Sequence, residues 1–261
     1  MRALALALLL TPAPALAQTT PQAPQAATAQ PRAKADAATR AQFDRSDALS
    51  RSVFWGGERD ADPLDPVAGV KLAQALRELG QFDKAAEAAQ ATIAVQPDNV
   101  EALLELGRAH IARGQAFYGV AALEQARDLA PRDWRPLSLL GVAYSQVRRA
   151  DDASAAWSAA LQLSPENPTV LANMAMSQAT AGDLAGAEGL LRRAAASPDA
   201  TLQVKQNLAL VLGLQGKSAE AETLLRRQLP PEAADQNLEW LRARAKDQAG
   251  AGRTWGSLQQ R

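Results

Sequence analysis

The sequence contains no cysteine, a single histidine and few aromatic residues, which make up 4% of its 261 residues. Without cysteine the chain can form neither a disulfide framework nor a thiolate metal site, and it has no cysteine that could carry a lipid. An excess of one charge is missing as well, because 28 Lys and Arg residues balance 28 Asp and Glu residues. This balance excludes a basic field of the kind that holds nucleic acid or an anionic membrane. Alanine, leucine, glutamine and arginine are abundant instead, and these residues favour helices.

The stretch from Asp65 to Leu229 repeats itself every 34 residues. The aligned columns are Pro97, Pro131 and Pro165; Ala73, Gly107, Gly141, Ala175 and Ala209; Leu72, Leu106, Leu140, Met174 and Leu208; Gly80, Gly114, Arg148, Gly182 and Gly216; and Ala85, Gly119, Ala153, Ala187 and Ala221. Small residues recur where two helices must approach closely, and bulky residues recur where space must be filled. The pattern resembles the tetratricopeptide repeat (TPR), with two antiparallel helices per repeat. We therefore predict an all-α fold, a right-handed superhelical TPR solenoid with about five repeats plus capping helices.

The five repeats are expected at residues 66–99, 100–133, 134–167, 168–201 and 202–229. In each repeat the first helix ends at the glycine column, and the second helix ends before the proline column. Asp65 is a predicted N-cap, with Pro66 in the first helical turn. Asp83, Asp151 and Asp183 are expected to favour the starts of second helices. Arg148 stands in the glycine column, so the third repeat must turn without glycine.

The segments before the repeats carry export and linker signals. Residues 1–17 are predicted to be a signal peptide, because a short apolar run leads to an A-x-A site, Ala15-Leu16-Ala17, before Gln18. A buried N-terminal helix is the alternative. Residues 18–35 are rich in Ala, Gln and Pro and predict a disordered linker. These features lead us to expect a periplasmic protein whose signal peptide is cleaved before Gln18, without a lipobox cysteine.

Two capping regions are expected to flank the repeats. Residues 36–65 predict a helical half-repeat with a stripe of Phe43, Leu49, Val53 and Phe54, ended by Trp55-Gly56-Gly57. Residues 230–261 predict a capping helix with Leu238, Leu241 and Ala245 inward, followed by a tail beyond Gly250 that could dock back.

No arrangement of residues indicates catalysis, a metal site or a cofactor. His110 is expected to be a packed side chain, since it takes the place that Tyr144 fills one repeat later and has no metal-ligating neighbours at helical spacing. Asp151 and Asp152 are better explained by a helix N-terminus than as an acid and base pair. Trp134 and Trp157 are expected in the core. The sequence thus predicts a protein that is not an enzyme, with no small-molecule substrate; an enzyme that uses His110 is the weaker hypothesis.

Resemblance to TPR domains implies that one face of the first helices lines a groove for a protein partner. The implied groove residues are Gln74, Arg77, Glu101, Leu104, Arg108, Ile111, Arg135, Ser138, Val142, Ser145, Thr169, Ala172, Asn173, Met176, Lys205 and Leu210. Apolar side chains with scattered arginine and amide groups suit an extended peptide or an amphipathic helix. An ordinary solvated helix face is the alternative. The carboxylate clamp of some chaperone-binding TPR domains is not matched, because its positions hold Val70, Gln74 and Glu105.

Short sequence segments, most of them beside the repeats, narrow the resemblance from TPR proteins in general to one family. Three segments of the chain are similar to the TadD-type TPR proteins of Tad (Flp) pilus assembly. The first is Phe54-Trp55-Gly56-Gly57 with Ala61-Asp62-Pro63-Leu64-Asp65-Pro66, and the second is the run from Gln206 to Gly216. The third is Leu229-Pro230-Pro231, followed by Asn237, Leu241, Trp255 and Leu258. This resemblance implies a periplasmic factor whose partner is the outer-membrane secretin or another Tad component. Peripheral outer-membrane association through that partner would follow. Many members are lipoproteins, and this chain departs from them because no cysteine follows the signal region.

A TPR scaffold of another envelope system is the alternative function. This alternative covers a pilotin-like role in type IV pilus assembly, exopolysaccharide export and cell-wall assembly.

Overall fold

The computed structural model describes residues 33–243, and from Lys34 onward they belong to one compact unit. The predicted signal peptide, nearly all of the predicted linker and the tail beyond Gly250 lie outside the described residues. The helices are α1 (Ala37–Asp44), α2 (Ala48–Ala61), α3 (Pro66–Glu78), α4 (Phe82–Val95), α5 (Val100–Ala112), α6 (Phe117–Leu129), α7 (Trp134–Gln146), α8 (Ala150–Leu163), α9 (Pro168–Thr180), α10 (Leu184–Ala196), α11 (Leu202–Leu214) and α12 (Ser218–Gln228). Residues 231–243 are also helical, and no strand occurs within residues 33–243.

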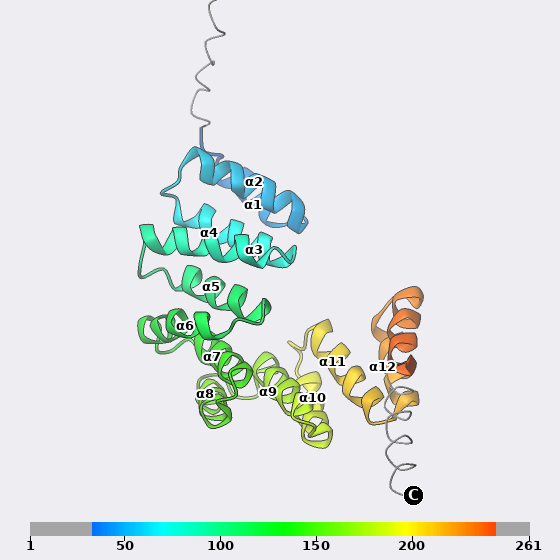
Figure 1. Ribbon diagram of the computed structural model, residues 1–261. Coiled ribbons are helices and arrows are strands. Elements are labelled where there is room, and N and C mark those ends of the chain that lie inside the picture. Colours follow the sequence, from blue (N-terminus) through cyan, green and yellow to red (C-terminus); the bar gives the residue numbers. More distant parts are fainter. Residues whose placement is uncertain (1–32, 244–261) are drawn as a thin grey trace, which may run out of the picture. The chain divides into compact units, whose positions relative to one another are not determined.

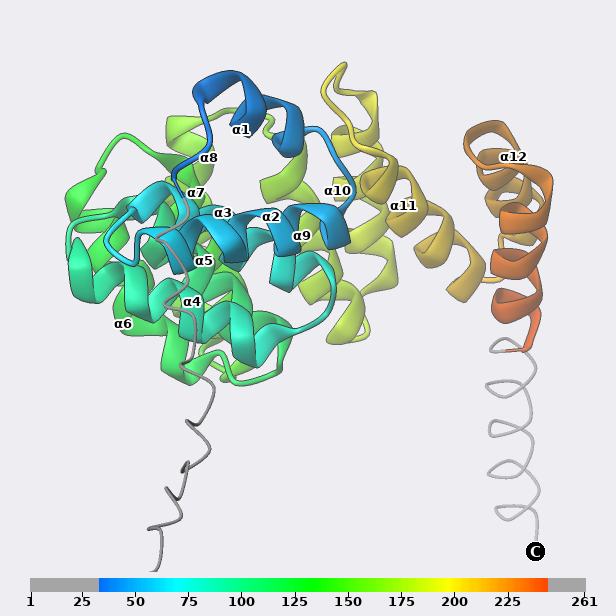
Figure 2. The ribbon, with the colours of Figure 1, turned by 90° about the horizontal axis from the view of Figure 1, so that it is seen from above.

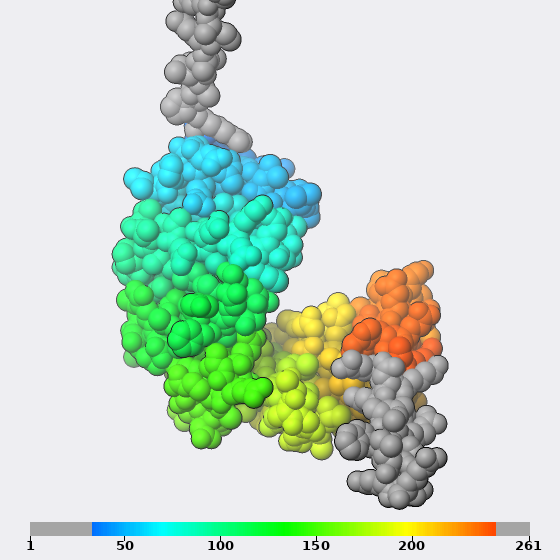
Figure 3. Space-filling view, in the orientation of Figure 1, coloured from blue at the N-terminus to red at the C-terminus, as the bar shows by residue number. Residues whose placement is uncertain are grey.

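The helices from α3 to α12 form five pairs, and within each pair a short turn brings the second helix back along the first (Figure 1, Figure 2). We call α3, α5, α7, α9 and α11 the A helices, and their partners the B helices. Each A helix also contacts the A helix of the next pair. In Figure 3 the colours follow one another in bands, so each pair touches its neighbours along the sequence. The all-α repeat architecture expected from the 34-residue period is confirmed.

Short polar side chains define where the A helices begin. The Asp65 carboxylate accepts hydrogen bonds from the backbone N–H groups of Val67 and Ala68, and Pro66 occupies the first turn, as predicted. Asn99, Asp133, Asn167 and Thr201 cap the other A helices in the same way. These oxygens satisfy backbone donors that have no partner inside the helix.

The B helices depend less on caps. Asp183 accepts from the backbone N–H of Gly186 at 2.8 Å, as expected. Asp83 and Asp151 lie inside the first turns of α4 and α8, where neither makes a cap hydrogen bond. Their contribution is limited to the favourable charge at a helix N-terminus. Packing against the A helices therefore holds most B helices in place.

The turn inside each pair requires a left-handed residue. Gly182 takes a φ of 94°, and the glycines of three other turns are also positive. In the third pair Arg148 adopts the same conformation, with a φ of 62°. A side chain in this region costs roughly 1 kcal/mol, which glycine avoids. The third pair therefore keeps the common turn and carries the strain.

Small residues permit close contact between the helices of a pair, as the repeat columns predict. A Cβ added at Gly141 would overlap the indole of Trp157, and one at Gly107 would overlap Leu123. Gly119, which departs from an alanine column, lies against the backbone of Gly107 and the Cβ of His110. Its missing side chain therefore serves packing at the same time as it weakens the helix.

The buried side chains along the stack form two main clusters. One includes Leu103, Leu123, Leu140 and Trp157, and it extends from α3 to the start of α9. The other is formed by α9 to α12 together with residues 231–243, where Leu238 and Leu241 are buried as expected. Leu161 on α8 packs against both clusters.

The N-terminal cap differs from the prediction in two respects. Trp55-Gly56-Gly57 does not end a helix, because α2 continues through it to Ala61. Leu49 and Val53 are exposed rather than inward, because α2 turns the side that carries Phe54, Trp55 and Glu58 toward the neighbouring elements. Phe43 and Phe54 do stack, with ring centroids 4.0 Å apart.

A buried carboxylate, which the sequence did not reveal, organises this cap. Glu58 is fully buried and accepts hydrogen bonds from the Arg40 guanidinium at 2.6 and 2.8 Å. It also accepts from the backbone N–H of Ala35. Arg40 additionally reaches Asp65 at 2.7 Å, which ties α1 and α2 to the N-terminus of α3.

Candidate functional site

The predicted groove residues lie on the A helices. They are Gln74 and Arg77 on α3; Glu101, Leu104, Arg108 and Ile111 on α5; Arg135, Ser138, Val142 and Ser145 on α7; Thr169, Ala172, Asn173 and Met176 on α9; and Lys205 and Leu210 on α11. We call this set the A-helix face. Because successive A helices touch, its residues from neighbouring repeats lie close enough to interact.

Ion pairs between repeats use most of the charged groups of this face. Arg77 on α3 donates to the buried carboxylate of Glu105 on α5 at 2.8 Å, and Arg108 donates to the same carboxylate. Arg135 on α7 reaches Glu101 on α5 at 2.7 Å. Glu105 was not among the predicted residues, although it joins two of them. Arg77 and Arg135 therefore hold neighbouring repeats together, whereas Arg108 pairs with Glu105 within α5.

Hydrogen bonding fixes the charge of the Arg135 group. The pKa of Arg135 is raised by its bonds to Asp133 and Glu101. Burial opposes ionisation of Asp133, but the hydrogen bonds that it accepts from Arg135 lower its pKa overall. Both groups stay charged near neutral pH and act as a fixed link between α5 and the start of α7.

Neutral polar groups connect α7 to α9. The Asn173 side-chain amide donates to Ser138 Oγ at 3.1 Å, and the hydroxyls of Ser145 and Ser177 lie 2.6 Å apart. Ser138 is buried, as is Ala172. The structure therefore places Ser138 and Ala172 under the surface rather than on an open wall.

Leu104 is fully buried and belongs to the core. Its assignment to an open groove was wrong, because the neighbouring helices cover the edge of α5 on which it lies. Gln74, Ile111, Val142, Met176 and Leu210 are half-buried, and Thr169 is exposed. Lys205 is half-buried and donates to Gln228 at 3.3 Å.

Two clefts open on the A-helix face. The first has a volume of about 370 Å³ and is lined by α3 and the start of α5, including Gln74 and Glu101. The second has a volume of about 650 Å³ and lies where α7, α8 and α9 meet. It brings together Val142, Asn173 and Met176. The structure thus gathers part of the predicted groove into two separate hollows.

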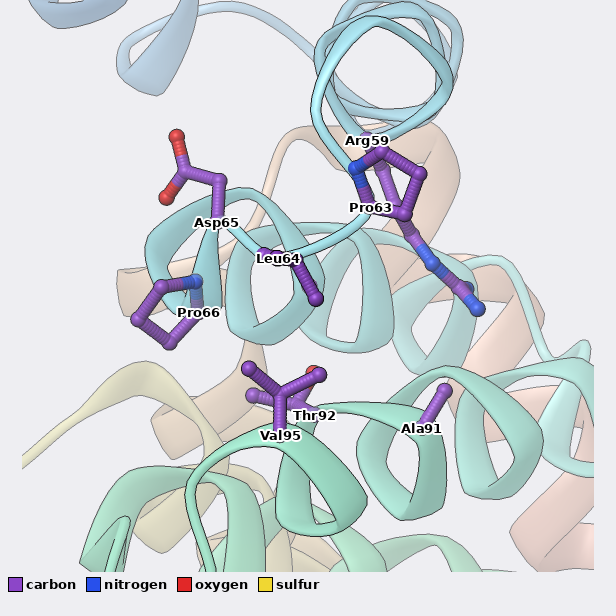
Figure 4. A pocket seen from close by; sticks show the side chains of 9 residues that line it. Arg59, Pro63, Leu64, Asp65, Pro66, Ala91, Thr92 and Val95 are labelled. Atoms are coloured by element: carbon purple, nitrogen blue, oxygen red, sulfur yellow. The ribbon is translucent and has the colours of Figure 1, made fainter.

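A third hollow beside the N-terminal cap is too small for a partner. It has a volume of about 10 Å³, room for about one water molecule. Leu64 lines it from the loop, Pro66 from the first turn of α3, and Thr92 and Val95 from α4 (Figure 4). The Asp65 carboxylate points away from Thr92 and Val95 and instead bonds to Arg40 (Figure 4).

His110 is a packed side chain, as expected. It is buried on α5, and its Nδ1 has no hydrogen-bond partner among residues 33–243. Burial lowers its pKa, and the charge of Arg113 lowers it further. Trp157 is buried too, whereas Trp134 is only half-buried.

Within residues 33–243, no group of three His, Asp or Glu side chains is placed to hold a metal ion. Across the same residues, no helix is both long and apolar enough to cross a bilayer.

Comparison with known proteins supports the architecture. A tetratricopeptide-repeat family model matches residues 70–116 and 138–201. The thermophilic TPR protein TTC0263 of Thermus thermophilus superposes with a TM-score of 0.57 at 20% identity, covering 67% of this chain and 94% of the other. MamA of Desulfovibrio magneticus RS-1 gives a TM-score of 0.51 at 19% identity, with 60% and 89% covered. The Cut9–Hcn1 hetero-tetramer of the APC/C gives 0.58 at 14% identity, with 70% and 36% covered.

The chain therefore has an all-α TPR fold, and its paired helices form the kind of scaffold that binds other proteins. Its A-helix face offers clefts and fixed polar links.

Proposed function

We propose that this protein is a non-enzymatic periplasmic adaptor for Tad (Flp) pilus assembly, which binds the outer-membrane secretin or another Tad component. The A-helix face carries the proposal, because its larger cleft combines apolar walls with amide and hydroxyl groups. Such a surface suits a polypeptide that presents alternating apolar and polar side chains.

The assignment to pili depends on the short sequence segments described above, and export depends on the apolar run before Gln18. The TPR fold is compatible with both features but is shared by proteins of many systems. Lacking a lipobox cysteine, the proposed adaptor would reach the outer membrane through its partner.

Affinity capture from periplasmic extract tests the proposal. The tagged full-length protein is expected to recover the secretin or another Tad component, and a deletion strain is expected to lose pili. Capture of neither, together with normal piliation in the deletion strain, would contradict the proposed function.

A matched pair of variants tests the surface itself. Met176→Glu places a charge in the larger cleft and is expected to reduce capture. Ala185→Glu adds the same charge at an exposed position of α10 and is expected to leave capture unchanged. Equal capture by both variants would show that the larger cleft does not take part in binding.

Capture of components of another envelope system would instead support the alternative scaffold. Type IV pilus, exopolysaccharide export and cell-wall machinery would each be recognised by the proteins recovered.

A further inference from the structure

The larger cleft occurs where two neighbouring repeats separate. Of the contacts between a B helix and the next A helix, that between α8 and α9 is the smallest. Three residues of α8 contribute to the lining together with α7 and α9: Ala150, which is exposed, and Ala153 and Trp157, which are buried apart from a small part of their surface. The cleft is thus deeper than the A-helix face alone would give.

The lining combines apolar and uncharged polar side chains with one cation. Val142, Met176 and Trp157 supply apolar surface, and Ser145, Asn173, Ser177 and Thr180 supply uncharged polar groups; the remaining residues are Gln146, Arg148, Ala150, Ala153 and Ala181. The lining contains no aspartate or glutamate, and Arg148 is its only charged residue. An apolar side chain that enters here would therefore lie beside an uncompensated positive charge.

Arg148 stands at this position against its own backbone preference. It adopts a positive φ in a turn where the other four pairs use glycine. Its neighbour Arg149 bonds to Asp152 at 2.7 Å and lies over the Tyr144 ring. Arg148, by contrast, is exposed, and no carboxylate among residues 33–243 lies within ion-pairing distance of it. Residues with strained backbones cluster at ligand-binding sites, and Arg148 lies at the edge of a cleft.

We propose that the cleft between α7, α8 and α9 binds an acidic, apolar segment of a partner protein. A bulky apolar side chain of that segment lies against Met176 and the edge of Trp157, and an aspartate or glutamate side chain pairs with Arg148. The proposal rests on the proposed function, for which it specifies the chemistry of the bound segment.

The charges of the chain's own flanks argue for a separate partner. Residues 1–32 contain no aspartate or glutamate, and residues 244–261 contain one aspartate against four basic residues. Both flanks therefore have a net positive charge, the same sign as Arg148. An acidic segment from another protein complements this charge, and guanidinium groups bind carboxylates through paired hydrogen bonds.

Two pools of terminally blocked synthetic peptides provide the probe. One pool fixes Phe-x-Asp, the other fixes Phe-x-Asn, and the surrounding positions are randomised. Fluorescence anisotropy with the full-length protein is expected to show tighter binding of the Asp pool. Arg148→Gly is expected to reduce that binding about tenfold, to the level of the Asn pool. The same variant relieves the positive φ, so its Tm is expected to rise by about 2–4 °C.

A blocking variant provides the second arm. Ala150 is exposed and lines the cleft, so Ala150→Trp fills it from the surface and is expected to abolish binding of both pools. A higher Tm in Arg148→Gly with unchanged affinity would show that Arg148 has only a structural role, and would overturn the proposal. Binding of the Asp pool to Ala150→Trp at wild-type affinity would also overturn the proposal.

If something else fills the cleft, a different result is expected, and each such result would also overturn the proposal. A peptide of residues 244–261 would compete with the Asp pool if the chain's own tail filled the cleft. Self-association abolished by Ala150→Trp would identify a second copy. If wild-type protein captures its partner from extract and both cleft variants do so equally well, the adaptor function stands and the acidic-segment proposal fails.

Discussion

Trp157 donates its indole N–H to the backbone carbonyl of Ser138 across 3.1 Å. The bond joins the two helices of the third pair at the point where the ring lies over Gly141. Ser138 also receives the side-chain amide of Asn173 from the next repeat. A single turn of α7 therefore connects its own B helix and the following A helix.

Enlarging the contact under the indole should destabilise the third pair. Gly141→Leu is expected to lower the free energy of unfolding by about 1–3 kcal/mol or more, because the added side chain must displace Trp157. Urea denaturation followed by circular dichroism measures the loss. Gly189 on α10 has no atom within 4 Å of an added Cβ, so Gly189→Ala is the control, with an expected gain of about 0.5–1 kcal/mol. Equal stability of Gly141→Leu and wild type would contradict the packing described for Trp157.

The two arginines on Glu105 should act non-additively. Arg77→Ala or Arg108→Ala alone leaves the buried carboxylate with one cation, so each is expected to lower stability by less than about 1 kcal/mol. The double variant leaves Glu105 without either cation and is expected to lose more than the sum of the single losses. A double-mutant cycle in urea measures the difference, and strict additivity would show that the arginines act independently.

Acid should weaken the link between α10 and the turn before α12. Glu188 accepts hydrogen bonds from Lys217 at 2.6 Å and Arg192 at 2.8 Å, and these bonds lower its pKa to about 2. Between this value and the ordinary 4.5, the unfolded chain binds a proton that the folded chain does not. The stabilisation is therefore complete above about pH 4.5 and is lost as the pH falls toward 2.

The Glu188 link can be isolated by comparing Tm against pH for the wild type and Glu188→Gln. The variant is expected to show a shallower loss of Tm over this acidic range. Parallel profiles would mean that the Glu188 contacts do not persist in solution.

His110 should make the second pair sensitive to mild acid. Its folded pKa lies below the ordinary 6.5, so the unfolded chain takes up a proton first as the pH falls. Stability is present above about pH 6.5 and declines as the pH drops toward the folded pKa. His110→Phe is expected to flatten Tm between pH 7 and 5 and to leave partner capture unchanged. A loss of capture by a well-folded His110→Phe would revive a functional role for this residue.

The 34-residue period predicted the helix pairs because the same small residues must recur wherever two helices approach. Gly141 and Gly107 illustrate this, since each lies directly against a bulky side chain of its B helix.

Local patterns were less reliable in the N-terminal cap. Trp55-Gly56-Gly57 reads as a helix end, yet burial of Trp55 and Glu58 against neighbouring elements keeps α2 helical beyond it. Glycine at the end of an apolar stripe therefore did not decide the local structure.

The exposure of the A-helix face was predicted only in part for a similar reason. Helical spacing selects the side of each A helix, but it does not show how much of that side the neighbouring repeat covers. Leu104 and Ser138 are covered, whereas Val142 and Met176 remain beside a cleft. The cleft itself depends on the reduced contact between α8 and α9, for which the sequence contains no spacing signal.

Adjacent residues at the start of α9 belong to different core clusters, Val170 to the one that begins at α3 and Leu171 to the one that continues to residues 231–243. Mechanical coupling between the two halves of the stack must therefore pass through α9 and its contact with Leu161. A polypeptide bound beside this helix would stiffen the joint, and the two halves would then unfold as one cooperative block instead of in succession.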